Sequence, residues 1–366
     1  MGLTDRLGAA LSGLGSRRLH VLVVEAPGAF DLRVRVDRAV TGRGWCAALS
    51  PADADALVVC GISPEPAFAD AVEVVWGQLP GPRVRTEVSD PSRVDAVLDE
   101  LAWSYQHWNP AADPVPTDHP TGQEDGDDDM SGMDDDMSGD DMSGMDGMDM
   151  SGPGGVPLAS GAADRDGLEM DVLHLPLGPV LPSWPAALTV SCTLQGDVIV
   201  AVDVQLTAAQ ADDEPGVDQA QPLAYRLDVA AQLLDLAGAG DLAVRARRAR
   251  NLSLDGADPG LVALRRRVGR TPLLRWSLRR VGDITQVTAA EHRWPKAWVG
   301  DAYDRLGRLL EPPPDSSLAL TAVAAALPVL LPGAELGSAR LTVASLLGHP
   351  LDVSARPSPD PSAVSA

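Results

Sequence analysis

The chain has 366 residues, of which 45 % are hydrophobic, so it is long enough for two domains that each have a core. Its net charge is −23 and no basic stripe runs along it, which argues against nucleic acid as a partner. Its three cysteines, Cys46, Cys60 and Cys192, include no C-x-x-C pair. They predict free thiols in a reducing cytoplasm rather than a disulfide framework or a zinc site.

Residues 17–108 combine apolar runs with helical periodicity. The predicted strands are 19–25, 56–61 and 83–88, and the predicted helices are 66–79 and 92–106. Strand–helix–strand–helix order predicts a small α/β domain with a parallel sheet in flavodoxin-like order.

Residues 109–166 interrupt this pattern. Residues 124–149 contain twelve Asp and Glu and no basic residue, and Met-Ser-Gly recurs from positions 130, 137, 142 and 150. Such a segment cannot repay the entropy of ordering, because it is highly charged and has no aromatic or β-branched residue. We therefore expect an acidic, disordered linker rich in Met, Asp and Gly.

Residues 167–352 predict a second domain, α+β and mostly helical. Residues 187–206 alternate on both sides of Gly196, as a hairpin with a glycine turn does. The expected helices are 222–250, 260–281 and 300–311, and residues 318–347 are expected to form an apolar helix, a turn and a closing segment. The tail, 353–366, is expected to be loose.

No segment predicts a signal peptide or a membrane span. The apolar stretch 318–331 is shorter than the ~20 residues that a span needs, and it contains Pro328. We expect a cytoplasmic protein without a transmembrane segment of its own, peripheral on the inner face of the membrane if it docks on a membrane complex.

The first domain resembles the small, cluster-carrying subunit shared by respiratory complex I and membrane-bound nickel–iron hydrogenases. The resemblance rests on SPADADALVVCG (50–61) and, after a helix, on the turn in VVWGQLPGPR (74–83). The residues that fit the family's turn, with its two prolines and its arginine at fixed spacing, are Trp76, Gln78, Leu79, Pro80, Pro82 and Arg83.

The second domain resembles the large subunit of the same complexes, which carries the quinone or nickel site. LGPVLPSWPAALTVSCTLQGDVIV (177–200) is similar to the family's Gly-Pro start and its hairpin, and AYRLDVAAQLLDLAG (224–238) to its first long helix. LPVLLPGAELGSARLTVASL (327–346) resembles the closing segment. The resemblance implies a fused small-plus-large subunit of an NADH–quinone oxidoreductase or hydrogenase type.

The ligands of that family are missing. Its small subunit places cysteines after the first strand, where this chain has Pro27, Gly28, Ala29 and Phe30. A four-iron cluster takes four thiolates, more than the chain has. Leu181 stands where the large subunit has a quinone-contacting histidine, and the nickel-binding C-x-x-C pairs are absent. The sequence therefore predicts no catalytic residue and no cofactor.

Other candidates have ordinary structural explanations. His174, His292 and His349 are expected to be solvated or hydrogen-bonded, although His349 stands where the family closes its active site. Trp294, Trp298 and Tyr303 either pack or line a pocket. The arginines between 265 and 280 form a solvated helix face or a patch for an acidic partner.

The linker raises one metal hypothesis. Thioethers suit Cu(I) and carboxylates suit harder cations, so its methionines are weak ligand candidates, against the simpler role of a spacer. These are Met130, Met133, Met137, Met142, Met145, Met148 and Met150.

Two functions follow as expectations. The first is a redox-inactive subunit, assembly factor or scaffold of a complex-I-like or hydrogenase-like membrane complex, with proton-channel or quinone-oxidoreductase subunits as partners. The alternative is a metal-handling protein that binds copper or another cation through its linker.

Overall fold

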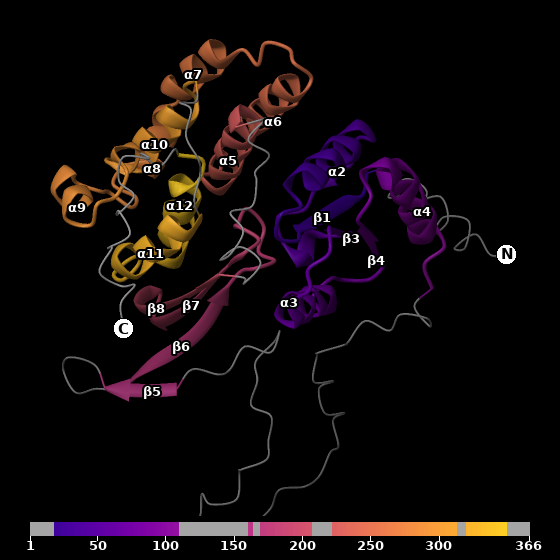
Figure 1. Cartoon of the computed structure of the whole chain (residues 1–366). Helices are drawn as coiled ribbons and strands as arrows, with labels where there is room; N and C mark the ends of the chain where they lie inside the picture. The colour runs from indigo at the N-terminus through magenta and orange to yellow at the C-terminus, as the bar shows by residue number, and fades with distance from the viewer. Residues whose placement is uncertain (1–17, 110–159, 164–168, 207–221, 313–319, 350–366) are drawn as a thin grey trace, which may run out of the picture.

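The computed structural model (Figure 1) describes residues 18–109, 160–163, 169–206, 222–312 and 320–349. The acidic stretch 124–149, the candidate methionines from Met130 to Met150 and the tail 353–366 lie outside these ranges. The predictions made for them stay predictions.

The first module is an α/β unit with a parallel sheet in the order β2-β1-β3-β4. Its elements are β1 (His20–Glu25), α2 (Phe30–Gly42), β2 (Cys46–Ala47), β3 (Ala56–Cys60), α3 (Pro66–Gly77), β4 (Val84–Val88) and α4 (Val94–Gln106). The predicted parallel α/β domain is thus confirmed, and the strand order agrees with a flavodoxin-like start. Helices α2 and α4 cover one face of the sheet and α3 covers the other.

Helix α2 and strand β2 are absent from the sequence prediction. In α2, Leu32, Val34 and Val36 alternate with charged residues, which is a strand-like pattern, yet all three are buried in a helix. The helix forms because β1 and β2 pair in parallel, and parallel strands need a crossover connection between them.

The second module begins with an antiparallel sheet in the order β5-β6-β7-β8. Its strands are β5 (Ser160–Ala163), β6 (Glu169–Leu177), β7 (Leu188–Gln195) and β8 (Val198–Leu206). The β7–β8 hairpin turns at Gly196, as predicted, with φ of +62°. Strand β5 lies in the range assigned above to the linker; its small residues, SGAA, carry no strand pattern.

Helices complete the second module. They are α5 (Pro222–Leu236), α6 (Gly240–Leu254), α7 (Leu261–Gly269), α8 (Pro272–Leu278), α9 (Gln286–Glu291), α10 (Ala302–Leu309), α11 (Leu320–Leu330) and α12 (Leu336–Leu346). The expectation of single helices over 222–250 and 260–281 is wrong. The first breaks at Gly238, whose φ of +73° permits a left-handed turn. The second breaks before Pro272, which starts a new helix.

One apolar core joins the helices of the second module to the inner face of its sheet. The first module lies beside it, with α2 next to the α5–α6 pair (Figure 1). None of the helices in the described ranges combines the length and the apolarity that crossing a bilayer requires.

Candidate functional site

The turn after β1 is where the resemblance places cluster ligands. Ala26 closes the strand by donating its N–H to the Cys60 carbonyl at 2.8 Å. Gly61 lies directly against this turn, because a Cβ on it would come within 2.6 Å of the Ala29 Cβ. Phe30, the first residue of α2, packs edge-on against Tyr225 of α5, with ring centroids 5.3 Å apart. The turn therefore contacts the second module directly.

The cysteines do not gather at this turn. Cys46 pairs with His20 at the start of β1, whereas Cys60 pairs with Glu25 at its end, on the opposite neighbouring strand. Five residues of extended chain separate these positions by about 17 Å. Cys192 is buried in β7 of the other module. The thiols present do not fit a shared iron–sulfur cluster.

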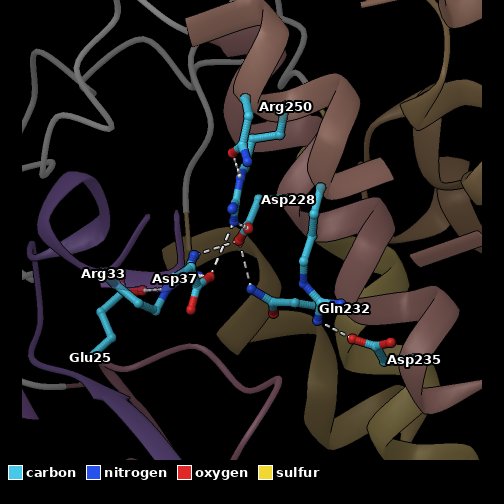
Figure 2. Close-up of polar contacts among 9 residues, drawn as sticks. Glu25, Arg33, Asp37, Asp228, Gln232, Asp235 and Arg250 are labelled. Atoms are coloured by element: carbon cyan, nitrogen blue, oxygen red, sulfur yellow. Dashed lines mark hydrogen bonds and ion pairs between the residues drawn. The ribbon is translucent and has the colours of Figure 1, made fainter. Parts of the chain in front are cut away.

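A cluster of five charged side chains lies at the same junction (Figure 2). We call Glu25, Arg33, Asp37, Asp228 and Arg250 the junction cluster. Arg33 of α2 bonds Glu25 and donates to Asp37 at 2.9 Å within its own module. It also donates to Asp228 of α5 at 2.5 Å, which crosses to the second module.

Arg250 of α6 completes the cluster from the second module. It bonds Asp228 and reaches back to Asp37 of α2 at 3.2 Å. Gln232 adds a third donor to Asp228 at 2.8 Å. Asp228 is 2 % exposed and Arg250 is 1 % exposed, so both charges are withdrawn from water and depend on each other.

Burial shifts the carboxyl groups in opposite directions. Burial alone would raise the pKa of Asp228, but Arg33 and Arg250 keep that pKa well below its usual range. Burial raises the pKa of Glu25, and the charge and hydrogen bond of Arg33 offset this only in part. Asp228 is therefore the fixed anion of the junction, whereas Glu25 takes up a proton more readily.

A cavity of about 90 Å³ adjoins the junction cluster. Glu25, Arg33 and Asp228 line one side, and the loop after β6 lines the other with Leu181 and Trp184. This volume is well below the ~300–1,000 Å³ typical of small-molecule sites. Leu181, the residue at the family's quinone-histidine position, thus faces a space that suits a few water molecules.

Apolar contacts seal the same junction. Val180, from the loop after β6, belongs to the core cluster under α3 in the first module, together with Leu22 and Val59. The turn that carries the small-subunit resemblance lies nearby in this core: buried Arg83 donates to the Trp76 carbonyl at 2.8 Å and lies 4.3 Å from its ring centroid. The quoted motif residues are therefore part of a packed scaffold.

The histidine candidates are separate from one another. His174 lies exposed on β6 beside Thr193, and His292 stacks on Trp294. His349 is buried and donates its Nε2–H to the Ser345 carbonyl at 3.1 Å. Burial, followed by the charge of Arg305, lowers the pKa of His349 to about 3, so it is neutral.

The aromatic candidates mainly pack. Trp298 is buried and donates its indole N–H to the Leu346 carbonyl at 3.1 Å, with Trp294 edge-on to it at 6.3 Å. Tyr303 lies under Arg275, 5.9 Å from ring centroid to guanidinium. Within the described ranges, no three His, Cys, Asp or Glu side chains come together as a metal site.

The junction cluster was not predicted from the sequence. Arg33 and Asp228 are 195 positions apart, and Asp37 and Arg250 are 213 apart. No local pattern marks them; the only available signal was a charged residue within an apolar helical face, as Asp228 is in α5.

No family model matches the chain, and neither the curated proteins nor the solved structures contained a match. The junction of the two modules, with its buried charges and its small cavity, is the candidate functional site.

Proposed function

We propose that this chain is a redox-inactive subunit or assembly component of a complex-I-like or hydrogenase-like membrane oxidoreductase. It would serve as a scaffold in which a small-subunit-like module and a large-subunit-like module are fused. The chain would perform no catalysis of its own, and its partners would be membrane-embedded proton-channel or quinone-oxidoreductase subunits.

One observation carries the proposal: the two modules meet at the turn after β1, and buried charges lock them there. The turn has Ala29 and Phe30 where cluster ligands would stand, and Phe30 packs on Tyr225 of the other module. Arg33 and Arg250 share Asp228 across the junction. This arrangement favours a role that depends on a fixed module orientation rather than on electron transfer.

Affinity purification tests the proposal. A tagged full-length chain, expressed in its native host and extracted with mild detergent, should recover proton-channel or quinone-oxidoreductase subunits identifiable by mass spectrometry. Asp228→Asn should reduce their recovery, because it removes the buried carboxylate of the second module that both Arg33 and Arg250 bond. Asp255→Asn is the matched control, since the Asp255–Arg38 pair also links the modules, at 3.0 Å, but is exposed. Recovery of no such subunit would overturn the proposal.

The metal-handling alternative depends on the concentration of methionines among carboxylates in the linker, where seven of the nine methionines lie. A chain lacking residues 124–152 separates the two functions. The scaffold proposal expects unchanged recovery of membrane subunits and unchanged copper tolerance. Lower copper tolerance with unchanged recovery would favour the alternative.

A further inference from the structure

Helices α7 and α8 carry a concentrated positive charge. Between Asp258 and Asp283 the chain has no acidic residue and seven arginines: Arg265, Arg266, Arg267, Arg270, Arg275, Arg279 and Arg280. All seven are exposed. Of the ion pairs formed within the described residues, only the one between Arg265 and Glu311, at 2.7 Å, involves this set. The remaining charge is available to an external partner.

Large apolar side chains are also exposed on α7 and α8. Val262 is 85 % exposed on α7, and Leu273 and Trp276 are 75 % and 78 % exposed on α8. The helices are nonetheless well anchored, because Leu264 and Leu274 on their other sides are buried in the core. We define the α7–α8 face as Val262, Arg266, Arg270, Leu273, Trp276 and Arg279. Its exposed apolar groups are part of firmly packed helices.

An open groove adjoins this face. Arg245, Arg266, Arg267 and Arg270 line a space of about 940 Å³ at the N-terminal end of α6, where Asp241 is the acidic side chain. The residue that precedes α6, Ala239, supplies no side-chain cap to the helix. The groove adds cationic surface to the arginines of the α7–α8 face, and anionic headgroups would fit there.

We propose that the α7–α8 face docks on the surface of an anionic lipid bilayer. Exposed arginines attract acidic headgroups, and Trp and Leu side chains enter the boundary between headgroups and acyl chains. A bilayer is favoured over an acidic protein because exposed Leu273 and Trp276 alternate in the sequence with exposed arginines, the combination of side chains that interfacial lipid binding uses. Lipid binding needs no protein partner, so the inference stands independently of the function proposed above.

The charge of the rest of the chain defines how it would dock. With a net charge of −23, the chain as a whole is repelled by an acidic membrane, and α7–α8 is the described segment with the densest positive charge. Docking through this face would therefore fix one orientation. It also predicts strong weakening by salt, because screening shortens the reach of the attraction.

Co-sedimentation with vesicles tests the inference on the purified full-length chain. Vesicles of equal parts phosphatidylcholine and phosphatidylglycerol should bind the protein, whereas phosphatidylcholine alone should bind it at least about tenfold more weakly. Binding to the acidic vesicles should fall as salt rises. Equal binding to both vesicle types, or to neither, would overturn the inference.

Surface variants locate the contact. The double variant Arg266→Gln/Arg270→Gln should lower the partition coefficient for acidic vesicles about tenfold or more. Leu273→Ser/Trp276→Ser should lower it severalfold by removing the inserting groups. Trp103→Ser is the matched control, because Trp103 is also exposed, at 62 %, but lies on α4 of the first module.

Circular dichroism spectra should be unchanged in all these variants, since the substituted side chains are exposed. Wild-type affinity in both double variants would overturn the assignment of the face. Binding to polyglutamate without binding to acidic vesicles would overturn the lipid assignment and identify an acidic protein as the partner.

Discussion

The molecule buries arginines in two different ways, at the junction cluster and at Arg305 of α10. Arg33 meets carboxylates from both modules, whereas Arg305 donates to the backbone carbonyls of Val281, Gly282, Trp298 and Gly300 and to the Ser345 hydroxyl. All the direct acceptors of Arg305 belong to the second module. The first site joins two modules, and the second joins loops within one.

The two environments have opposite effects on the guanidinium groups. Burial lowers the pKa of Arg305 to about 10, because carbonyl dipoles bond it without supplying a full negative charge. Burial also acts to lower the pKa of Arg33, but Asp228, Glu25 and Asp37 raise it well above its usual value. The comparison indicates that the junction cluster is governed by charge and the Arg305 site by hydrogen-bond geometry.

Removing the Arg305 side chain should cause the largest loss of stability. Arg305→Met leaves four carbonyls and a hydroxyl without their buried donor, and we expect a loss of about 3–5 kcal/mol in the free energy of unfolding of the second module. Arg305→Lys should recover little, because an ammonium cannot reproduce the planar fork. Urea unfolding followed by circular dichroism measures the effect.

Arg308→Met is the control for this change, since the Arg308 side chain donates to one carbonyl among the described residues, that of Ala297, at 2.9 Å. It should cost about 1 kcal/mol. Equal losses for the two variants would contradict the central structural role of Arg305.

Breaking the junction cluster should lower the free energy of unfolding somewhat less, and it should also change the number of unfolding transitions. Asp228→Asn removes the more deeply buried of the two carboxylates that Arg33 and Arg250 share and leaves them Asp37, at an expected cost of about 3 kcal/mol. Because this energy couples the modules, the single urea transition should separate into two. Asp255→Asn should cost less than about 1 kcal/mol and leave one transition. A single, unshifted transition for Asp228→Asn would show that the cluster does not couple the modules.

The stability of the Asp228 and Arg305 variants should depend differently on pH. The pKa of Asp228 is depressed in the folded protein, so its contribution is complete above the usual aspartate pKa and disappears as pH falls through the folded value. The stability difference between wild type and Asp228→Asn should therefore shrink in acid. The difference for Arg305→Met should stay nearly constant, because the groups that bond Arg305 within the described ranges are carbonyls and a hydroxyl.

The pKa of Glu25 is shifted in the opposite direction to that of Asp228. Since its folded pKa is raised, the folded protein keeps a proton on Glu25 that the unfolded chain has lost, and stability falls as pH rises through that window. Glu25→Gln should thus gain stability relative to wild type as pH rises above the usual glutamate pKa. Urea midpoints measured across this range test both variants, and a parallel pH profile for wild type and Glu25→Gln would contradict the assigned direction.

The sequence predicted those elements whose own residue pattern indicates which side chains are buried. The buried strands β1 and β3 are continuous apolar runs, and the β7–β8 hairpin combines alternation with Gly196, so each was found. Helix α2 was missed because Leu32, Val34 and Val36 alternate as in a strand, and only its place between two parallel strands makes it a helix.

The site was much less predictable than the fold. A buried charge is tolerated only where partners surround it, and the partners of Asp228 come from α2, α5 and α6. The Arg305 site could not be predicted either, because four of its acceptors are backbone carbonyls, which every residue has. Such sites depend on tertiary placement, which local periodicity does not contain.

The smallest expected effect is the binding of iron and sulfide. Full-length protein incubated anaerobically with iron and sulfide should show no iron–sulfur absorbance after gel filtration. Cys46 of β2 and Cys60 of β3 pair with residues at opposite ends of β1, which are about 17 Å apart along the strand. Dimerisation does not supply the missing ligands: Cys46 is the exposed thiol, so two copies pool two accessible thiolates, whereas Cys60 and Cys192 stay buried. Burial also raises the pKa of Cys192 to about 11, which disfavours the thiolate that iron requires. Stoichiometric iron and sulfide that disappear in Cys46→Ser or Cys60→Ser would instead mean that the first module rearranges to form a cluster, and the junction would then be a redox site rather than a lock between two modules.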